Sequence, residues 1–508
     1  MEAEHLDVLI VGGGVSGIGA AAHLELNCPT KSYAVLEMRD AIGGTWDLFR
    51  YPGVRSDSDM FTFGYSFKPW SADEVLADGE SIRNYVRETA EEYGVVQKIR
   101  FHHRVHTASW SSEDARWTLT GERVDTGETF TLTASFVVTC TGYYNYDEGY
   151  APEFPGAERF NGTIIHPQFW PEELDYEGKR VVIIGSGATA VTLVPAMAGT
   201  AKHVTMLQRS PSYVLSLPAV DPLARALRRF LPEMVVHRIT RAKNIALMFG
   251  VFKLSRSRPR LVRKILRRSA ERHLPDGYDV DVHFNPSYDP WDQRMCFVPG
   301  SDLFNAIASG EASVVTDQIE TFTEQGLRLA SGREVEADIV VSATGLKLLA
   351  LGGLKLSVDG QSIDIGGRLA YRAMMLEGVP NLGWVAGYTN MSWTLRCNLT
   401  CAYICRLLNH MDAHGYRYCI PRLDDPTVER QPFVDLKSGY VRRGIDSFPK
   451  QGPAPPWRGY QNYLRDLRYI GRAPLEDGVL RFEPNGRRPS ASVASRNREA
   501  SEAVSAPS

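Results

Sequence analysis

The sequence lacks the features that mark several classes of protein. No apolar run approaches the ~20 residues that a membrane-spanning helix needs, so we expect no spanning segment. The seven cysteines are an odd number without CxxC spacing, which argues against a disulfide framework and against a zinc site. The formal net charge of −3 gives the whole chain no attraction to nucleic acid. We therefore expect neither a metal nor a nucleic-acid partner.

The remaining composition is that of a globular protein, with 43% hydrophobic and 23% charged residues in 508. This length predicts two or three domains with sizeable cores. The N-terminal run MEAEHLDVLIVGGG carries acids where a secretory signal carries Lys or Arg. Together with the cysteine pattern, this predicts reduced thiols and a cytoplasmic protein. Cys397, Cys401 and Cys405 recur every four residues, which indicates one helix face of small, buried side chains.

One pattern occurs twice along the chain, over residues 6–24 and again over residues 180–197. In each case a short apolar strand leads into a glycine-rich turn and then into a helix of small residues. Later strand-like runs end at Gly142 and at Gly345. This repetition is typical of nucleotide-binding βαβ units. The sequence therefore predicts an α/β fold with two related Rossmann-like, dinucleotide-binding domains.

The first turn has the GxGxxG arrangement at Gly12, Gly14 and Gly17. Such glycines permit a tight turn, close approach of a pyrophosphate and close packing of the helix. Glu37 follows Gly17 by twenty residues, at the end of an apolar run. An acid at this place accepts hydrogen bonds from an adenosine ribose and repels a 2′-phosphate, which favours FAD or NAD over NADP. The alternative is an accidental turn with a surface glutamate.

The second turn carries Gly185, Gly187 and Ala190, and the strand that follows ends without a carboxylate. Gln208 and Arg209 stand in its place. A guanidinium binds a 2′-phosphate in bidentate fashion, and each hydrogen bond to a charged group contributes roughly 1.5–3 kcal/mol. The pattern predicts NADPH at this site. The alternative is that Arg209 is a surface charge.

Two dinucleotide sites in one chain indicate a bound flavin that a diffusible nicotinamide reduces. A disulfide reductase shares this plan, but it needs a redox-active cysteine pair beside the flavin. No such pair follows the first glycine motif. The chain is therefore interpreted as a flavoprotein of another type.

A basic segment interrupts the second unit, since residues 222–272 hold fifteen Lys or Arg against two Glu, with apolar residues at helical spacing. The preferred interpretation is a solvated helical cap over the active-site cleft. The alternative is a membrane-surface helix attracted to anionic lipid. Pro222, Pro232 and Pro259 favour the cap because proline breaks a long amphipathic helix.

The predicted domain organisation is discontinuous. We assign residues 1–150 and 345–487 to an FAD-binding domain, 151–221 and 285–344 to an NADP-binding domain, and 222–284 to the helical insertion. The Ser-, Ala- and Pro-rich tail, 488–508, is predicted to be disordered.

A pattern between the two units carries a resemblance. Phe160, Gly162, His166, Trp170 and Pro171 match FxGxxxHxxxW followed by Pro or Asp. The chain thus resembles the class B flavoprotein monooxygenases and, among them, the Baeyer–Villiger enzymes. It looks closest to the ethionamide-activating branch, with which it shares runs such as GGTWDLFRYPG and YYNYDEGY. The resemblance covers roughly residues 5–485.

The resemblance implies a reaction and two catalytic residues. In that family NADPH reduces FAD, and the reduced flavin combines with O2 to form a C4a-peroxyflavin. The anionic form attacks ketones to give esters or lactones, and the protonated form oxidises thioethers or thioamides. Arg294, in the run PWDQRMC, matches the arginine that stabilises the anion, and Asp57 matches the acid that positions it. The plainer alternatives are a surface charge for Arg294 and a turn residue for Asp57.

The glycine motifs and the resemblance together predict the residues around each cofactor. For FAD these are Gly12, Gly14, Ser16, Gly17, Glu37, Thr45, Trp46, Asp47, Asp57 and Val105. For NADP they are Arg55, Gly185, Ser186, Gly187, Ala188, Thr189, Ala190, Gln208 and Arg209.

Further parts of the resemblance concern residues outside the glycine motifs. His166 and Trp170 are assigned to an interdomain linker that couples movement of the NADPH domain to the flavin. Gln293 departs from the lysine that many relatives carry before the active-site arginine, which leaves Arg209 as the main determinant of NADPH preference. The segment that contains Met391 and Ser392 resembles one that closes over the flavin ring, and a packing role is the alternative.

Two rival functions stay open at this point. One keeps the cofactors but oxidises sulfur or nitrogen rather than ketones. The other binds FAD and NADP without turnover. The identity of the small-molecule substrate, a ketone or an organosulfur compound, and the oligomeric state do not follow from the sequence.

Overall fold

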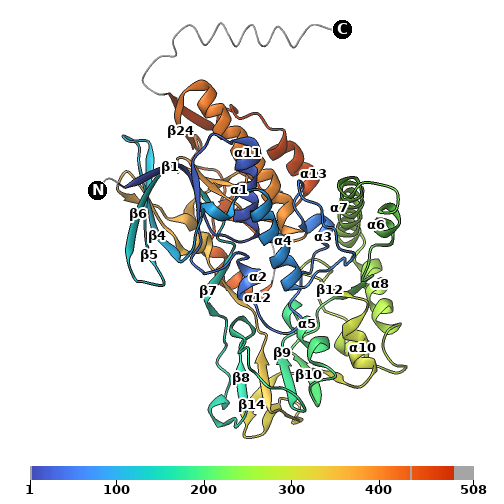
Figure 1. The fold of residues 1–508 in the computed structure, drawn as a ribbon. Helices are drawn as coiled ribbons and strands as arrows, with labels where there is room; N and C mark the ends of the chain where they lie inside the picture. Colours follow the sequence, from blue (N-terminus) through green and yellow to red (C-terminus); the bar gives the residue numbers. More distant parts are fainter. Residues whose placement is uncertain (1–2, 435–437, 485–508) are drawn as a thin grey trace.

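Two sheets dominate the computed structural model, which describes residues 3–434 and 438–484. In Figure 1 the first sheet lies at the upper left and the second at the bottom, with a group of helices along the right edge. The predicted disordered tail, 488–508, lies outside the described residues.

The first sheet is built around β1. Its strands are β1 (Glu4–Val11), β2 (Tyr33–Leu36), β3 (Ile99–Arg100), β4 (His103–Ser111), β5 (Arg116–Arg123), β6 (Thr129–Thr139), β19 (Lys355–Val358), β20 (Gln361–Ser362) and β23 (Leu382–Trp384). β1 pairs in parallel with β2 and β6, while β4 and β5 continue the sheet in antiparallel fashion.

Residues of β1 face two separate cores. Val8 and Ile10 pack against the helices on one side, and Leu9 packs against the opposite core. Burial on both faces is why this strand reads as a continuous apolar run. The helices that belong to this part are α1 (Val15–Asn27), α2 (Thr45–Leu48), α3 (Met60–Phe63), α4 (Gly79–Glu92), α11 (Trp393–His414), α12 (Gly439–Gly444) and α13 (Tyr463–Asp466).

The second sheet is parallel throughout, in the order β13-β10-β9-β17-β8. It consists of β8 (Thr163–Ile165), β9 (Arg180–Ile184), β10 (His203–Gln208), β13 (Ala312–Thr316) and β17 (Ile339–Ser342), with α5 (Ala188–Met197) and α10 (Asp302–Ala308). The two α/β units confirm the predicted fold class. The domain borders remain predictions.

A ribbon of two antiparallel strands connects the sheets. It pairs β7 (Tyr144–Gly149), which leaves the first sheet, with β18 (Leu346–Leu348), which returns from the second. One further sheet has three strands, β14 (Ile319–Thr323), β15 (Gly326–Leu329) and β16 (Glu334–Glu336). The remaining strands form pairs: β11 (Val214–Leu217) with β12 (Cys296–Pro299), β21 (Ala370–Tyr371) with β22 (Met375–Leu376), β24 (Tyr416–Pro421) with β27 (Leu480–Pro484), and β25 (Gln431–Pro432) with β26 (Lys450–Gln451).

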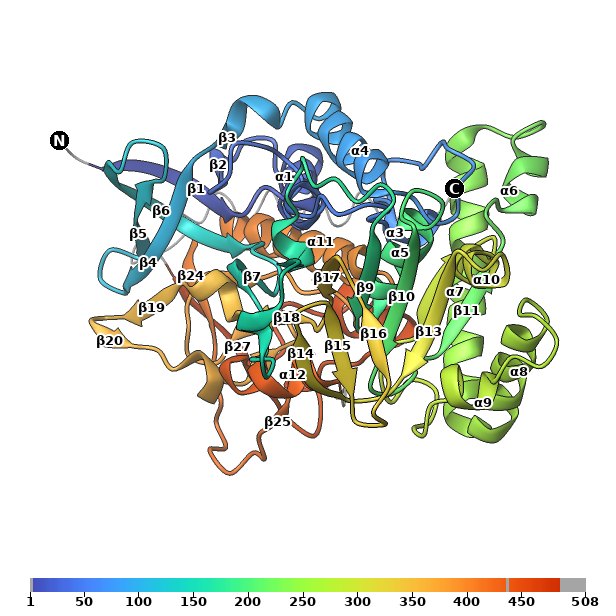
Figure 2. The ribbon, with the colours of Figure 1, turned by 90° about the horizontal axis from the view of Figure 1, so that it is seen from below.

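The basic segment is helical, as predicted. It forms α6 (Pro222–Leu227), α7 (Glu233–Ser257), α8 (Pro259–Glu271) and α9 (Val280–His283), which lie together at one edge of the molecule in Figures 1 and 2. The three prolines stand at helix starts, where the missing N–H costs nothing. They therefore separate α6, α7 and α8 from one another, as predicted, while the 25 residues of α7 itself run without a proline.

The three spaced cysteines lie in α11, and all three are buried. This confirms that they occupy one helix as small core side chains. Among the described residues, no helix has the length and apolar character needed to span a membrane.

Candidate active site

The first glycine turn fits its predicted role. Gly12 has φ +107°, and a Cβ there would lie 2.6 Å from the Cys140 carbonyl oxygen. A Cβ on Gly17 would lie 1.8 Å from the Gly12 carbonyl oxygen. No side chain fits at either position, so the turn and the start of α1 depend on glycine.

Glu37 follows β2 and closes the far side of this turn. Its carboxylate accepts hydrogen bonds from the backbone N–H groups of Gly13 (2.6 Å) and Arg39 (2.8 Å). Burial raises the pKa of Glu37. A cavity of about 100 Å³, called the ribose cavity here, is lined by Glu37, Gly12 and Val105. The predicted ribose acid and Val105 therefore meet at one hollow.

The central cavity, of about 220 Å³, begins where the ribose cavity ends. The two share Gly14, Cys140, Tyr144 and Tyr146. Its walls include Ser16, Thr45 and Trp46 from the FAD set and reach Asp57 and Arg294. The pair of cavities therefore extends from Glu37 at one end to Arg294 at the other.

Asp47 does not line either of these cavities. It is buried and pairs with Arg39 and Arg50 at 2.7 Å each, and with Arg83 at 3.7 Å. A Cβ on Gly43 would lie 3.1 Å from the Asp47 Cβ. The acid thus supports the turn that carries Thr45 and Trp46 from beneath.

Arg294 and Asp57 form the ion pair that the resemblance implied. The distances from Arg294 Nη2 are 3.2 Å to Asp57 Oδ2 and 3.4 Å to Oδ1. The neighbouring carboxylate is the main cause that raises the pKa of Arg294, so the guanidinium stays charged. Both residues line the central cavity and the nucleotide cavity described below. The pair therefore stands where the two cofactor sites meet.

Three tyrosines near Arg294 were not among the predicted site residues. Tyr143, Tyr144 and Tyr440 each contribute to the raised pKa of Arg294. Burial is the main cause that raises the pKa of Tyr440 to about 12. Tyr143 and Tyr144 directly follow the strand-like run that ends at Gly142. That position is the feature of the sequence by which they could have been predicted as site residues.

The second glycine turn opens on the nucleotide cavity, of about 650 Å³. Gly185 has φ +140°, and a Cβ there would lie 2.5 Å from the Ala343 carbonyl oxygen. A Cβ on Gly187 would meet nothing within 4 Å, which leaves room for a pyrophosphate. Ser186, Ala188 and Thr189 also line the cavity, while Ala190 is buried in α5.

Of the two residues expected at the second ribose, only Arg209 faces this cavity. Arg209 is exposed and lines it together with Gln293. Gln208 is buried, and its amide donates to the His283 carbonyl and to Thr316 Oγ1 at 2.9 Å each. Gln208 therefore secures the end of β10 from the inside.

Arg55 does not lie beside the glycine turn of the second unit. It pairs with Asp302 and lines the central cavity. Ala188, Thr189 and Thr192 of α5 line the same cavity. Arg55 therefore stands on the wall that the central cavity shares with α5 of the second unit.

His166 belongs to the connection between the sheets. Its Nδ1 accepts from the Gln168 N–H at 3.2 Å, so Nε2 carries the proton that it donates to the Gly345 carbonyl at 3.1 Å. Gly149 lies so close that a Cβ there would be 2.2 Å from the ring. Trp170 is buried in the core below the second sheet. These positions support the linker interpretation.

The other residues of the FxGxxxHxxxW pattern lie outside the site. Phe160 packs against the core that contains β14 and β15, Gly162 lies against the Asp338 carbonyl, and Pro171 is exposed. None of these three lines the cavities described here.

The segment before α11 closes the central cavity. Met391 and Trp393 line it, and the Trp393 indole N–H donates to Ser16 Oγ at 2.8 Å. Ser392 and Met391 also border a smaller side cavity of about 50 Å³, which Arg294 and α7 share. The predicted closing segment thus contacts Ser16 after the first glycine turn and lines both the central and the side cavity.

Two joined dinucleotide cavities that meet at a charged arginine define a flavin- and nicotinamide-dependent oxidoreductase. The model of the flavin-binding monooxygenase-like family matches residues 6–350, and the chain belongs to this family. The prediction of a flavin monooxygenase is therefore confirmed.

Relatives extend the match over almost the full length. The chain is 54% identical to the putative FAD-containing monooxygenase MymA of Mycobacterium tuberculosis over 94% of this chain and 98% of that protein. It is 53% identical to the FAD-containing monooxygenase EthA of the same species, with 94% and 98% covered. It is also 50% identical to the probable FAD-binding monooxygenase AlmA of Acinetobacter baylyi, with 94% and 96% covered.

Solved structures agree in fold. A steroid monooxygenase bound to NADP matches with a TM-score of 0.75 at 21% identity, covering 95% of this chain and all of that one. An open form of cyclohexanone monooxygenase matches with a TM-score of 0.67 at 19% identity, covering 82% and 90%. Membership of a flavin-binding family confirms the prediction that the chain binds a flavin, and the steroid monooxygenase of the same fold was solved with NADP bound.

Proposed function

We propose that the chain is an NADPH-dependent monooxygenase of the Baeyer–Villiger type, which converts apolar ketones to esters or lactones and also accepts organosulfur compounds. The observation that carries the proposal is the Arg294–Asp57 pair at the junction of the two cofactor cavities. A permanent cation at this junction suits chemistry that passes through negative charge on oxygen.

Bound FAD, once reduced by NADPH, would supply the oxygen-transferring chemistry with O2. Arg294 would hold its guanidinium against the negative charge that develops on the oxygen donor and on the substrate carbonyl. Asp57 keeps that guanidinium aimed, because a carboxylate at 3.2 Å restricts its orientation. Gly12, Gly14 and Glu37 would hold the FAD pyrophosphate and ribose. In the nucleotide cavity, Gly187 and Arg209 would hold the phosphates of NADPH.

The cavity walls support an apolar substrate. Phe63, Phe297, Tyr388 and Met391 line the central cavity. The side cavity next to Arg294 adds Ile245, Met248 and Trp291. Such walls bind a substrate by burial of apolar surface, and Arg294 would lie at its carbonyl.

The thiols support a reducing compartment, and we infer a cytoplasmic protein. All seven cysteines are buried and unpaired. Disulfides are rare in reducing compartments, so an unpaired set fits one.

Product analysis tests the proposal directly. Purified protein with FAD, NADPH and O2 is given a cyclic ketone beside a thioether, and products are compared with NADPH consumed. Lactone formation coupled to NADPH oxidation is expected. Sulfoxide alone would favour the heteroatom monooxygenase, and hydrogen peroxide without either product would favour a redox-binding protein.

A further inference from the structure

The outer surface of the helical insertion exposes an unusual share of large apolar side chains. They are Leu223, Phe230, Leu231, Val235, Ile239, Leu247, Leu254, Leu261 and Ile265. Phe230, between α6 and α7, is 83% exposed. Single exposed apolar residues are ordinary on a soluble surface, whereas a concentration along adjacent helices indicates an interaction site.

Cations without a partner accompany these apolar residues. Arg225, Arg228, Lys243, Arg256, Arg263 and Arg267 each pair with an acid. In the part of the chain that the structure describes, no ion pair is formed by Arg229, Arg238, Lys253, Arg258, Arg260, Lys264, Arg268 or Arg272. An apolar surface surrounded by free cations has the chemistry that an anionic lipid surface attracts.

The opposite face of α7 reaches the active site. Ile245 packs with Tyr388 and Met391, and Met248 borders the same cluster. Ile245 and Met248 also line the side cavity that contains Arg294. The helix α7, which lies at one edge of the molecule (Figures 1 and 2), therefore separates the side cavity from the exposed apolar and basic side chains.

We propose that the outer surface of α6–α8 docks on an anionic lipid bilayer, and that apolar substrates enter the site from that bilayer. The part that concerns substrates rests on the proposed function, and the docking does not. The predicted cap and the membrane helix are then two faces of one insertion, because the inner face covers the site and the outer face binds lipid. Docking in the plane of the bilayer requires no spanning helix.

Vesicle flotation tests the docking. Holoprotein is mixed with vesicles of phosphatidylglycerol and phosphatidylcholine, or of phosphatidylcholine alone. Binding is expected only to the anionic vesicles and falls with added salt, because salt screens exposed charges. The variant R260E/K264E/R268E should bind at least about 100-fold more weakly, since each Lys or Arg near an anionic surface contributes ~1 kcal/mol. The matched control K179E/K202E/R333E changes the same number of exposed charges outside the insertion and should bind like the unchanged protein.

Several results would overturn the docking proposal. Equal vesicle binding by the R260E/K264E/R268E variant and the control variant would overturn it. Duplex DNA that competes fully with the vesicles for the protein would also overturn it. Activity on a water-soluble ketone distinguishes the two proposals. The R260E/K264E/R268E variant should keep this activity while losing vesicle binding, whereas failure of the proposed function would remove activity from every variant and leave binding intact.

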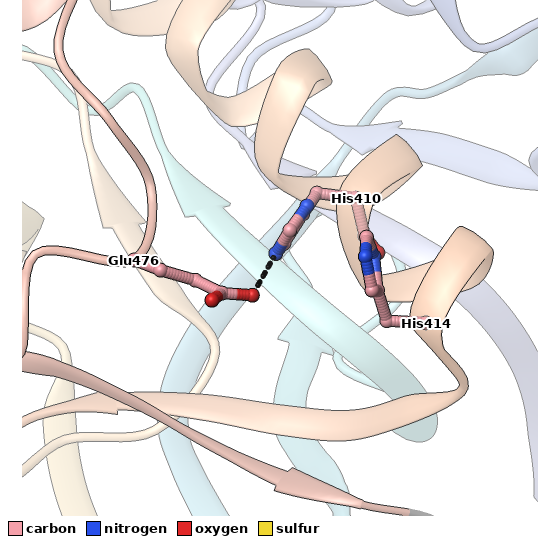
Figure 3. A group of neighbouring side chains, drawn as sticks. All are labelled: His410, His414 and Glu476. Carbon is pink, nitrogen blue, oxygen red and sulfur yellow. Dashed lines mark hydrogen bonds and ion pairs between the residues drawn. The ribbon is translucent and has the colours of Figure 1, made fainter. Parts of the chain in front are cut away.

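A second inference comes from a different part of the chain. Figure 3 shows His410 and His414 one turn apart at the end of α11, with Glu476, from the segment before β27, directed at His410. Their potential ligand atoms all lie within 4.8 Å of one another. His410 Nε2 lies 3.0 Å from Glu476 Oε1. Two histidines four residues apart on a helix share a face, as helix-borne zinc ligands do.

The hydrogen bonding of His414 prepares it as a ligand. Its Nδ1 lies 2.9 Å from the His410 carbonyl oxygen, which can only accept, so Nδ1 carries the proton. Nε2 is therefore left with its lone pair. A ring nitrogen that donates to a backbone carbonyl while the other nitrogen stays free is the usual arrangement of a metal-bound histidine.

We infer that His410, His414 and Glu476 bind a divalent transition-metal ion such as Zn²⁺, with water as a fourth ligand. Zinc needs ligand atoms at ~2.0–2.2 Å, so the three donors must close on the ion. The Glu476 side chain is 58% exposed and free to do so. Binding would replace the hydrogen bond between His410 and Glu476 and join the end of α11 to the segment before β27.

Calorimetry with zinc chloride on EDTA-treated holoprotein tests this site. One saturable site is expected, with a higher unfolding temperature in the presence of zinc. H414A and E476Q should weaken binding at least about tenfold, while magnesium chloride should not bind because Mg²⁺ prefers oxygen ligands. H106A is the matched control, since His106 pairs with Glu122 at 3.2 Å on another surface. Absence of saturable zinc binding, or equal binding by H414A and H106A, would overturn the inference.

Discussion

Arg209→Ala should impair the use of NADPH far more than the use of NADH. Arg209 is exposed on the wall of the nucleotide cavity, directly after the end of β10, and is the residue proposed to bind the 2′-phosphate. Gln293 stands on the same wall without a charge, and Arg443 stacks on Tyr150 at 3.5 Å. The removal of one or two charge-assisted hydrogen bonds, at roughly 1.5–3 kcal/mol each, should raise the KM for NADPH at least about tenfold.

Steady-state kinetics with both nicotinamides measures this effect. The KM for NADH should change by less than about twofold, because NADH has no 2′-phosphate to lose. Arg333→Ala, at an exposed arginine that does not line the nucleotide cavity, is the control. An equal rise in both KM values, or no rise for NADPH, would refute the role assigned to Arg209.

Three further outcomes are expected. Gln293→Lys should lower the KM for NADPH, by about tenfold for one added charged hydrogen bond, in the same kinetic assay. Gly17→Ala should abolish FAD binding, measured by flavin absorbance after gel filtration, because its Cβ would lie 1.8 Å from the Gly12 carbonyl oxygen. Burial lowers the pKa of His237 to about 4, so between pH 6.5 and pH 4 the unfolded state binds a proton that the folded state does not. Urea unfolding should therefore show that the free energy of unfolding falls by up to about 3 kcal/mol as the pH is lowered from 6.5 to 4, and that this fall is smaller in His237→Gln. Equal pH dependence of the two proteins would contradict the assignment.

Short-range patterns predicted much of the site. The two glycine turns, Glu37 and the placement of Arg209 follow from spacing within single βαβ units, where geometry is nearly fixed. The Arg294–Asp57 pair joins residues 237 positions apart. It was foreseen only through the family resemblance.

What the sequence did not predict depends on tertiary packing. Gln208 is the last residue of β10 and is buried, whereas Arg209 directly follows the strand and reaches the cavity. Asp47 is held beneath its turn by three arginines from separate positions along the chain, Arg39, Arg50 and Arg83. The outward face of the insertion depends on which apolar residues the core leaves uncovered, and helical periodicity alone does not reveal this.

Arg294→Ala, compared with Arg294→Lys, tests the central claim most directly. NADPH consumption, lactone formation from a cyclic ketone and hydrogen peroxide are measured together at saturating NADPH. If Arg294 stabilises the developing negative charge, Arg294→Ala should bind FAD and still consume NADPH, yet form lactone at least about 100-fold more slowly and release peroxide instead. Arg294→Lys should retain part of the lactone rate because it keeps a cation. Lactone formation by Arg294→Ala at the rate of the unchanged protein would contradict the account.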